Sequence, residues 1–165
     1  MARSTTECDI SAIVKEAIDK HGVTSDALIP VLKQINDTVG HIPTRAFEEI
    51  HKQLLRQGEF VQVSKGQLYG LASFYSMLST KPRGRHVIKF CESAPCHVVG
   101  GKAVWDSLCE TLGLKNDEMT PDNKWTLLTT SCLGLCSLGP VLLIDDDLYG
   151  NVNPDQIDEI LARYE

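Results

Sequence analysis

Four of the six cysteines in this sequence fall into two close pairs, and thiols are well suited to hold a metal. Cys91 and Cys96 stand five positions apart around Pro95, and Cys132 and Cys136 enclose three residues. Each pair directly follows a predicted strand. Because loops at the carboxyl ends of strands in a small α/β sheet can converge, the four thiols can form one shared site.

Four kinds of chemistry compete for these thiols. Structural zinc usually uses C-x2-C pairs, so the wider gaps here make zinc possible but second in rank. A thioredoxin-type dithiol catalyst needs C-x-x-C at a helix start, a spacing that the sequence lacks. Structural disulfides need an oxidising compartment, for which the sequence gives no signal. A C-x4-C pair occurs in plant-type [2Fe-2S] proteins, so a two-iron cluster leads on spacing.

The residues inside and beside the pairs suit a buried negative centre. Gly134 allows backbone amides to approach the sulfurs, and Leu133 and Leu135 can keep water away. Gly100 and Gly101 allow the following helix to pack closely. Amide hydrogen bonds and limited exposure set how readily a cluster accepts an electron. Each residue also has a simpler interpretation, as a turn glycine or a core leucine.

Two further cysteines and one histidine are weaker candidates. Cys8 is expected in a frayed N-terminal tail, and Cys109 falls on a predicted helix where its spacing from Leu108 indicates burial. We interpret both as bystanders rather than ligands. His97 follows Cys96 directly, but a Rieske-type centre needs two Cys-x-His pairs and the sequence has none. His97 can still donate a hydrogen bond near the site.

The first half of the chain has the periodicity of helices. Apolar residues recur at helix spacing, and Ser64 with Gln67 forms a capping-box pattern. In the third helix, Phe47, Ile50 and Leu54 are expected to face inward together with Leu55. The segment "STKPRGR" at 79–85 breaks the pattern and is the best candidate linker. The predicted helices cover residues 10–21, 25–40, 44–55 and 64–75.

The second half has the pattern of a small α/β layer domain. Its order is strand, helix, strand, strand, helix, with Asp145–Asp147 in a hairpin turn before a fourth strand. Gly113 ends the first of its two helices. The predicted strands are 86–90, 125–130, 140–145 and 149–152, and the predicted helices are 98–114 and 154–164.

Composition limits the classes of partner and compartment. A formal net charge of −6 argues against a general nucleic-acid surface. No apolar run approaches the roughly 20 residues that span a bilayer, so we expect no direct membrane insertion. The first residues lack an apolar signal core. We therefore expect a cytoplasmic protein whose thiols stay reduced.

Several stretches together resemble a known family. They are "LIPVLKQINDTVGHIP" (28–43), "YGLASFYSMLSTKPRGRHVIKFCESAPCHVVGG" (69–101), "SCLGLCSLGPVLLIDDDLYGNV" (131–152) and the final helix. "GLASFYS" fits the family's Gly-x-Ala-Thr-Phe-Tyr signature, with Ser73 in place of Thr. The chain is similar to the 24-kDa-type [2Fe-2S] subunit of NADH:quinone oxidoreductase and to its relatives in NAD(P)-linked hydrogenases and formate dehydrogenases.

The resemblance implies the fold and the ligands. The fold would be α+β/α/β, with an N-terminal helical bundle for assembly or docking (1–80) and a thioredoxin-like [2Fe-2S] ferredoxin domain (81–165). One [2Fe-2S] cluster would be held by Cys91, Cys96, Cys132 and Cys136. The Gly139–Pro140 bond, just before the third strand, is expected to have a special role near the cluster, such as a cis conformation.

The resemblance also implies the partners. FMN and NAD(P) are expected on a partner subunit, since this chain has no G-x-G-x-x-G fingerprint. Other iron–sulfur subunits would complete a hetero-oligomeric complex, without nucleic acid. The expected function is one-electron transfer inside an NAD(P)-dependent oxidoreductase, with no catalytic residues and no complete active site in this chain. The alternatives are a free-standing thioredoxin-like ferredoxin shuttle and a zinc-stabilised scaffold.

Overall fold

The computed structural model describes residues 7–56 and 63–164, with side chains from residue 9 onward. The chain forms two compact units that divide between Pro82 and Arg83, within the segment 79–85 that the sequence marks as a linker. Each unit has its own hydrophobic core. In the described ranges, no helix is both long and apolar enough to cross a bilayer.

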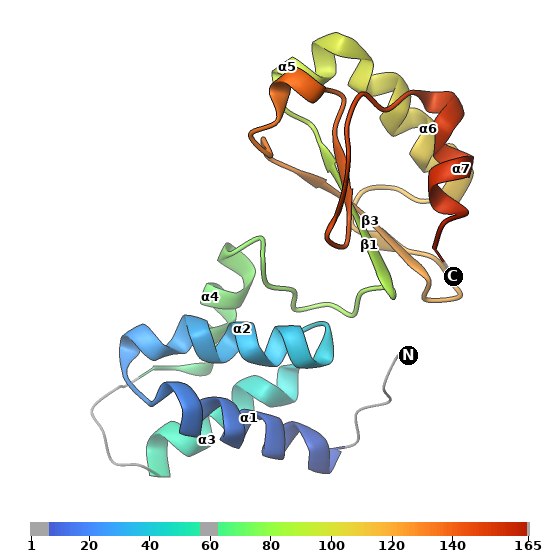
Figure 1. Cartoon of the computed structure of the whole chain (residues 1–165). Coiled ribbons are helices and arrows are strands. Elements are labelled where there is room, and N and C mark those ends of the chain that lie inside the picture. The colour runs from blue at the N-terminus through green and yellow to red at the C-terminus, as the bar shows by residue number, and fades with distance from the viewer. Residues whose placement is uncertain (1–6, 57–62, 165) are drawn as a thin grey trace. The chain divides into compact units, whose positions relative to one another are not determined.

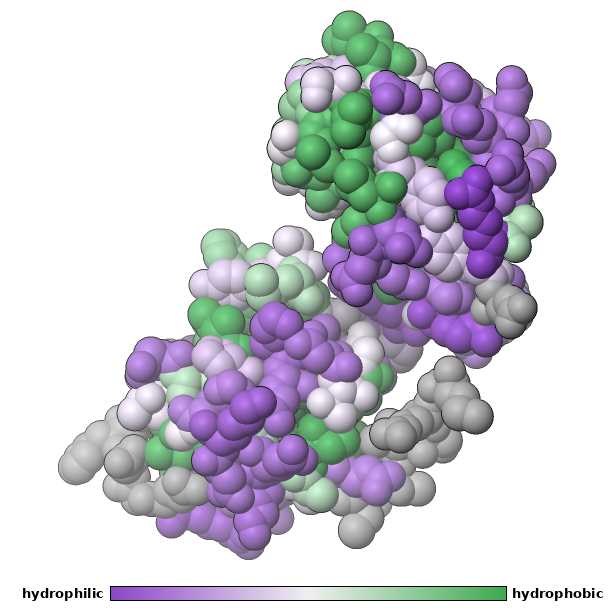
Figure 2. Space-filling view, in the orientation of Figure 1, coloured by the Kyte–Doolittle hydropathy of each residue, from purple (hydrophilic) through white to green (hydrophobic). Residues whose placement is uncertain are grey.

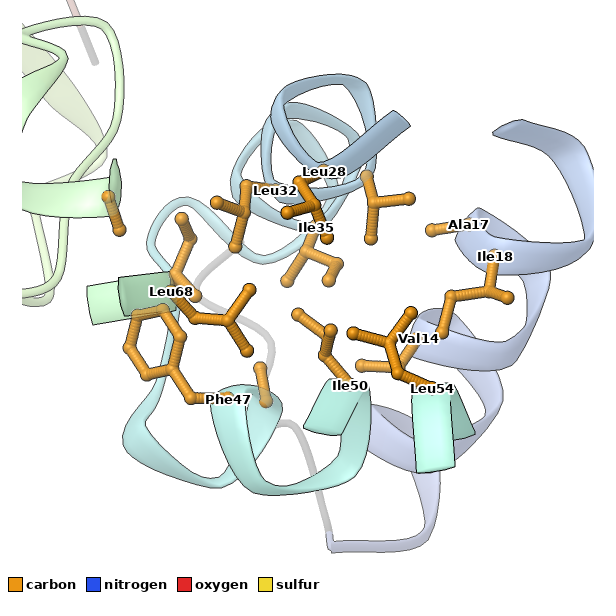
Figure 3. Packing of buried hydrophobic residues seen from close by; sticks show 14 of the residues in the cluster. Val14, Ala17, Ile18, Leu28, Leu32, Ile35, Phe47, Ile50, Leu54 and Leu68 are labelled. Atoms are coloured by element: carbon orange, nitrogen blue, oxygen red, sulfur yellow. The ribbon is translucent and has the colours of Figure 1, made fainter. Parts of the chain in front are cut away.

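Within residues 7–56 and 63–82, the first unit contains four α-helices and one short 3-10 turn. Their apolar faces meet in one core, seen in Figure 3, whose central residues Leu32, Ile35 and Leu68 are fully buried. The predicted ends at His21 and Gly40 are confirmed, and Gly40 caps its helix with a φ of 88°. The elements are α1 (Glu7–His21), η1 (Ser25–Ala27), α2 (Leu28–Val39), α3 (Thr44–Arg56) and α4 (Lys65–Phe74).

The capping box predicted for this unit is confirmed, whereas the inward orientation predicted for Leu55 is wrong. Ser64 and Gln67 form the expected capping box, in which each side chain accepts a hydrogen bond from the other residue's backbone N–H. Leu55 does not face inward: its side chain is 70% exposed. The buried stripe of α3 runs through Phe47, Ile50 and Leu54, and Leu55 lies about 100° further around the helix.

The second unit is built on a five-stranded mixed sheet in the order β2-β3-β1-β4-β5. β1 and β3 are parallel, whereas the other neighbouring pairs are antiparallel. The parallel pair aligns Cys91 with Thr130, so β1 and β3 end side by side. The strands are β1 (His86–Cys91), β2 (Glu118–Met119), β3 (Trp125–Thr130), β4 (Leu142–Ile144) and β5 (Asp147–Tyr149).

Two helices pack side by side on the sheet (Figure 1). The core between them and the sheet includes Ile88 and Leu127 from the strands and Leu108 and Ile160 from the helices. The helical elements of this unit are α5 (Ala94–Cys96), η2 (His97–Gly101), α6 (Lys102–Leu112), η3 (Cys136–Leu138), η4 (Pro154–Gln156) and α7 (Ile157–Leu161).

Several predicted boundaries in this unit need correction. The helix expected at 98–114 starts as α6 at Lys102, because the preceding turn is broken at Gly100, which has a φ of 101°. The last strand is 147–149 rather than 149–152, since the hairpin turns earlier, at Asp145, with a φ of 53°. The closing helix ends at Leu161, and the two-residue β2 was not expected.

Candidate functional site

The first thiol pair lies at the end of β1 and at the end of the short helix α5 that follows it. Cys91 is the last residue of β1, and its backbone N–H donates to the carbonyl of Val141 at 3.1 Å. Cys96 ends α5, whose first turn contains Pro95. Proline is favoured there because its fixed φ suits a helix start. Both cysteines are only 2% exposed, so this pair is buried.

The second thiol pair lies on an exposed loop after β3. The sulfurs of Cys132 and Cys136 are 3.4 Å apart, and both residues are exposed. Gly134, with a φ of 80°, turns the chain between them and donates its backbone N–H to the sulfur of Cys132 at 3.3 Å. The expected role of Gly134 in bringing an amide to a sulfur is therefore confirmed.

The sheet brings the two pairs together. β1 and β3 run in parallel, so the loops that follow them leave from the same edge. Gly139 lies between the two loops: a β-carbon built there would lie 3.4 Å from the sulfur of Cys96 and 3.4 Å from the carbonyl oxygen of Cys136. The Gly139–Pro140 bond at this point is cis, as expected.

Apolar side chains surround the buried pair. Val141 is 1% exposed and packs with Cys91 and Cys96, while Leu133 and Leu135 cover the same cluster from the second loop. The two leucines therefore limit the access of water, as the sequence indicates. Sequence reasoning missed Val141, which both packs on the thiols and accepts the Cys91 amide hydrogen bond. The sequence signal for Val141 is that it directly follows Gly139-Pro140, which the sequence places near the cluster.

The thiols differ in acidity for reasons that the geometry explains. Burial is the largest single influence on the pKa of Cys91 and raises it, but the hydrogen bonds from the backbone amides of Ser93 and Leu133 and from the side chains of Cys96 and Ser93 together lower the pKa below its ordinary value. Burial, followed by the hydrogen bond to Cys91, raises the pKa of Cys96. The hydrogen bond to Cys132 raises the pKa of Cys136. Metal binding would have to displace protons held within these pairs.

The remaining cysteines lie on α1 and α6, and His97 directly follows Cys96. Cys109 is partly buried on α6 and packs against the core of the sheet, and burial raises its pKa. The backbone of Cys8 lies in α1, not in a frayed tail, and its side chain is outside the described residues. His97 is exposed at the start of η2.

The donor set fits a two-iron cluster better than a single metal ion. In a [2Fe-2S] cluster the four ligands divide into two on each iron. The structure offers that division, because Cys91 and Cys96 form a buried pair and Cys132 and Cys136 form an exposed pair, with Gly139 between them. A zinc ion instead needs its ligands around one point. Within residues 9–56 and 63–164, no three His, Cys, Asp or Glu side chains gather in that way.

The acidic run at residues 145–147, which ends on the first residue of β5, has a structural role. Asp145 receives the backbone N–H of Val87 at 2.9 Å, and its other carboxylate oxygen lies 2.7 Å from Nδ1 of His86. Asp147 accepts a hydrogen bond from the hydroxyl of Tyr164 at 2.9 Å. These contacts hold the hairpin and the C-terminal segment on the sheet, which agrees with the turn expected there.

Comparison with known proteins gives consistent matches. The model of the thioredoxin-like [2Fe-2S] ferredoxin family matches residues 14–165. A subunit of the NADH-quinone oxidoreductase of Salmonella typhimurium is 34% identical over 97% of this chain and 95% of its own length. The HndA subunit of the NADP-reducing hydrogenase of Solidesulfovibrio fructosivorans is 30% identical over 83% of this chain and 76% of its own length.

A solved structure of an NAD+-reducing [NiFe]-hydrogenase in the H2-reduced state matches 80% of this chain with a TM-score of 0.64 and 21% identity. The match takes up 21% of that hydrogenase chain, so it supports the fold alone. The family match covers both thiol pairs and most of the sequence, and full-length relatives reach 34% identity. This chain belongs to the thioredoxin-like [2Fe-2S] ferredoxin family.

Proposed function

We propose that this chain is the [2Fe-2S] subunit that carries one electron at a time within a multi-subunit NAD(P)-dependent oxidoreductase of the NADH dehydrogenase or hydrogenase type. The observation that carries this proposal is the meeting of two thiol pairs at one edge of the sheet, with the Cys132–Cys136 pair exposed. An electron-transfer centre needs such an exposed side, because the partner's redox group must come close to it.

The proposed ligands are Cys91, Cys96, Cys132 and Cys136. When bound, the cluster would supply a reversible one-electron oxidation and reduction. The protein contributes amides: those of Ser93 and Leu133 lower the pKa of Cys91, and that of Gly134 donates to Cys132. These donors stabilise negative charge on sulfur, which tunes the reduction potential. Leu133, Leu135 and Val141 restrict water at the buried pair.

The proposed partners are a subunit that binds flavin and NAD(P), and further iron–sulfur subunits. The names of the relatives support this, because they belong to subunits of an NADH-quinone oxidoreductase and of an NADP-reducing hydrogenase. This chain carries no dinucleotide fingerprint, so FMN and NAD(P) are assigned to the partner. A cytoplasmic location is part of the same proposal.

The two units have different proposed roles. Residues 81–165 would form the cluster domain, and residues 1–80 a helical bundle used in assembly. The separate core of α1–α4 supports an assembly role, since it holds its own fold and adds no described thiol to the site. A free-standing ferredoxin shuttle would need no such helices, so their presence favours the subunit.

The test is cofactor analysis of the full chain purified without oxygen. We expect about two irons and about two sulfides per chain, visible absorption, and an EPR signal that develops on reduction. A colourless protein with one zinc ion and no iron would overturn the proposal. A cluster-loaded chain that purifies from its native host without any partner would point instead to the free-standing shuttle.

A further inference from the structure

Cys132 and Cys136 form a pair of neighbouring thiols on an exposed loop. Their sulfurs are 3.4 Å apart. Two cysteine sulfurs bond at about 2 Å, so a small change in the side-chain torsions would join them. When the two thiols hold no metal, they are therefore placed to form a disulfide with each other.

Short-range contacts within the loop keep the two thiols together. Gly134, with a φ of 80°, turns the chain between them, and its backbone N–H donates to the sulfur of Cys132 at 3.3 Å. After the second cysteine, the backbone N–H of Leu138 donates to the carbonyl of Leu135 at 2.9 Å and closes the turn η3, which starts at Cys136. Because this short loop is already folded, a bond across it costs little further conformational entropy.

The loop also allows a small anionic oxidant to approach. No Asp or Glu occurs in residues 131–144, so no carboxylate within this segment repels a negatively charged disulfide. In Figure 2, the part of the second unit where this loop lies is mostly white and green, which marks neutral to hydrophobic residues. Thiol–disulfide exchange needs access to the reacting sulfur, and the exposed pair provides it.

The other thiols are less accessible. Cys91 and Cys96 are each 2% exposed and are covered by apolar side chains from both loops. Cys109 is partly buried and packs against the core of the sheet. Among the cysteines whose side chains the structure describes, reaction with a dissolved disulfide is therefore directed to the exposed pair.

We propose that Cys132 and Cys136 are a redox-sensitive pair in the cluster-free chain. A low-molecular-weight disulfide such as oxidised glutathione links them to each other, and the linked chain does not accept a cluster until a thiol reduces the bond. The inference rests on the proposed function, because the same two sulfurs are proposed ligands and the bond occupies both. In a reducing compartment, a disulfide is typically of this transient, redox-sensing kind.

The reaction is an exchange in two steps. A thiolate of the pair attacks one sulfur of oxidised glutathione, whose S–S bond breaks and releases one glutathione. The second cysteine then attacks its neighbour in the mixed disulfide and releases the second glutathione. The pair loses two electrons and two protons, and one oxidised glutathione gains them as it becomes two thiols. A dithiol reductant reverses both steps.

The experiment uses the full chain, stripped of its cluster and reduced without oxygen. After incubation with oxidised glutathione, free thiols are blocked with iodoacetamide in denaturant and tryptic peptides are analysed by mass spectrometry. Trypsin leaves each thiol pair within one peptide, 90–102 or 125–163, so a disulfide within a pair appears as the loss of two hydrogens and of both blocking groups. Iron uptake from ferrous iron and sulfide is measured on the same samples, with and without dithiothreitol.

We expect the peptide 125–163 to lose its free thiols at least about tenfold faster than the peptide 90–102. The oxidised chain should take up about tenfold less iron than the reduced chain, and dithiothreitol should restore the uptake. Cys136→Ser should stop at a mixed disulfide with glutathione on Cys132, because the second step lacks its thiol. Cys109→Ser is the matched control and should react like the unmodified chain.

Oxidation of both pairs at equal rates, a lasting mixed disulfide in the unmodified chain, or full iron uptake by the oxidised chain would overturn this inference and leave the proposed function intact. If the reduced chain itself takes up no iron, the proposed function fails, and the block on cluster loading fails with it.

Discussion

The backbone of Gly101 lies directly against the backbone of Cys96: a β-carbon at Gly101 would come within 2.6 Å of the carbonyl oxygen of Cys96 and 3.3 Å of the ring of Phe90. Gly101 ends the wide turn η2, which follows the buried thiol and leads into α6. The close approach thus fixes the start of α6 against a candidate ligand, and no side chain larger than hydrogen fits there.

Gly101→Ala should therefore displace the backbone that carries Cys96. We expect the free energy of unfolding to fall by about 1–3 kcal/mol, the usual cost of overpacking, and iron per chain to fall with it. Gly70→Ala is the control, since a β-carbon at Gly70 in α4 would meet no atom within 4 Å. Denaturant unfolding and iron analysis measure both effects, and equal behaviour of the two variants would contradict the prediction.

Replacement of each proposed ligand by serine should remove or impair the cluster. Cys91→Ser and Cys96→Ser should also lower the free energy of unfolding of the cluster-free chain by about 1–3 kcal/mol, because each places a hydroxyl at a buried position. Cys132→Ser and Cys136→Ser change exposed positions and should leave that stability unchanged.

Iron content and the EPR spectrum of the reduced chain check these variants. Cys109→Ser is the matched control, since Cys109 packs against the core of the sheet and should not affect the cluster. Full cluster retention in any one of the four ligand variants would remove that residue from the site.

Cluster removal should expose a difference between the two thiol pairs. In the cluster-free chain, an alkylating reagent should modify Cys132 and Cys136 much faster than Cys91 and Cys96, because the first two are exposed and the other two are buried. In the loaded chain all four should resist modification. Mass spectrometry of timed samples reports each site, and equal rates at the four cysteines of the cluster-free chain would be inconsistent with the buried pair.

The C-terminal tyrosine predicts a loss of stability in alkali. Burial, followed by contacts with Tyr149 and Asp147, raises the pKa of Tyr164 far above its ordinary value of about 10. The unfolded chain would release this proton from about pH 10 while the folded chain keeps it. The stabilising contribution is therefore complete below that pH and is lost as the pH rises further.

Tyr164→Phe should show a weaker fall of unfolding free energy above about pH 10 than the unmodified chain. Denaturant titrations from about pH 8 to about pH 11 would measure the two curves, with the lysines and other tyrosines common to both. Parallel curves over that range would show that Tyr164 does not titrate differently in the two states.

Local sequence signals placed many elements correctly because their causes are local. The capping box at Ser64 and Gln67, the glycine stop at Gly40 and the strand at 125–130 each depend on residues within a few positions. Leu55 shows the limit. It is apolar and adjacent to the buried stripe, so an approximate helix period predicts that it faces inward. Its angle around α3 nevertheless leaves it exposed.

By itself, the sequence determined the two thiol pairs, their spacing, the glycine between Cys132 and Cys136, and the family to which the chain belongs. Only the tertiary structure decided that Cys91 and Cys96 are buried while Cys132 and Cys136 are exposed, and that Val141 and Gly139 contact the first pair. These facts depend on the parallel alignment of β1 and β3, which brings together residues about 40 positions apart. Burial and close approach arise from such long-range packing, and no local pattern specifies them.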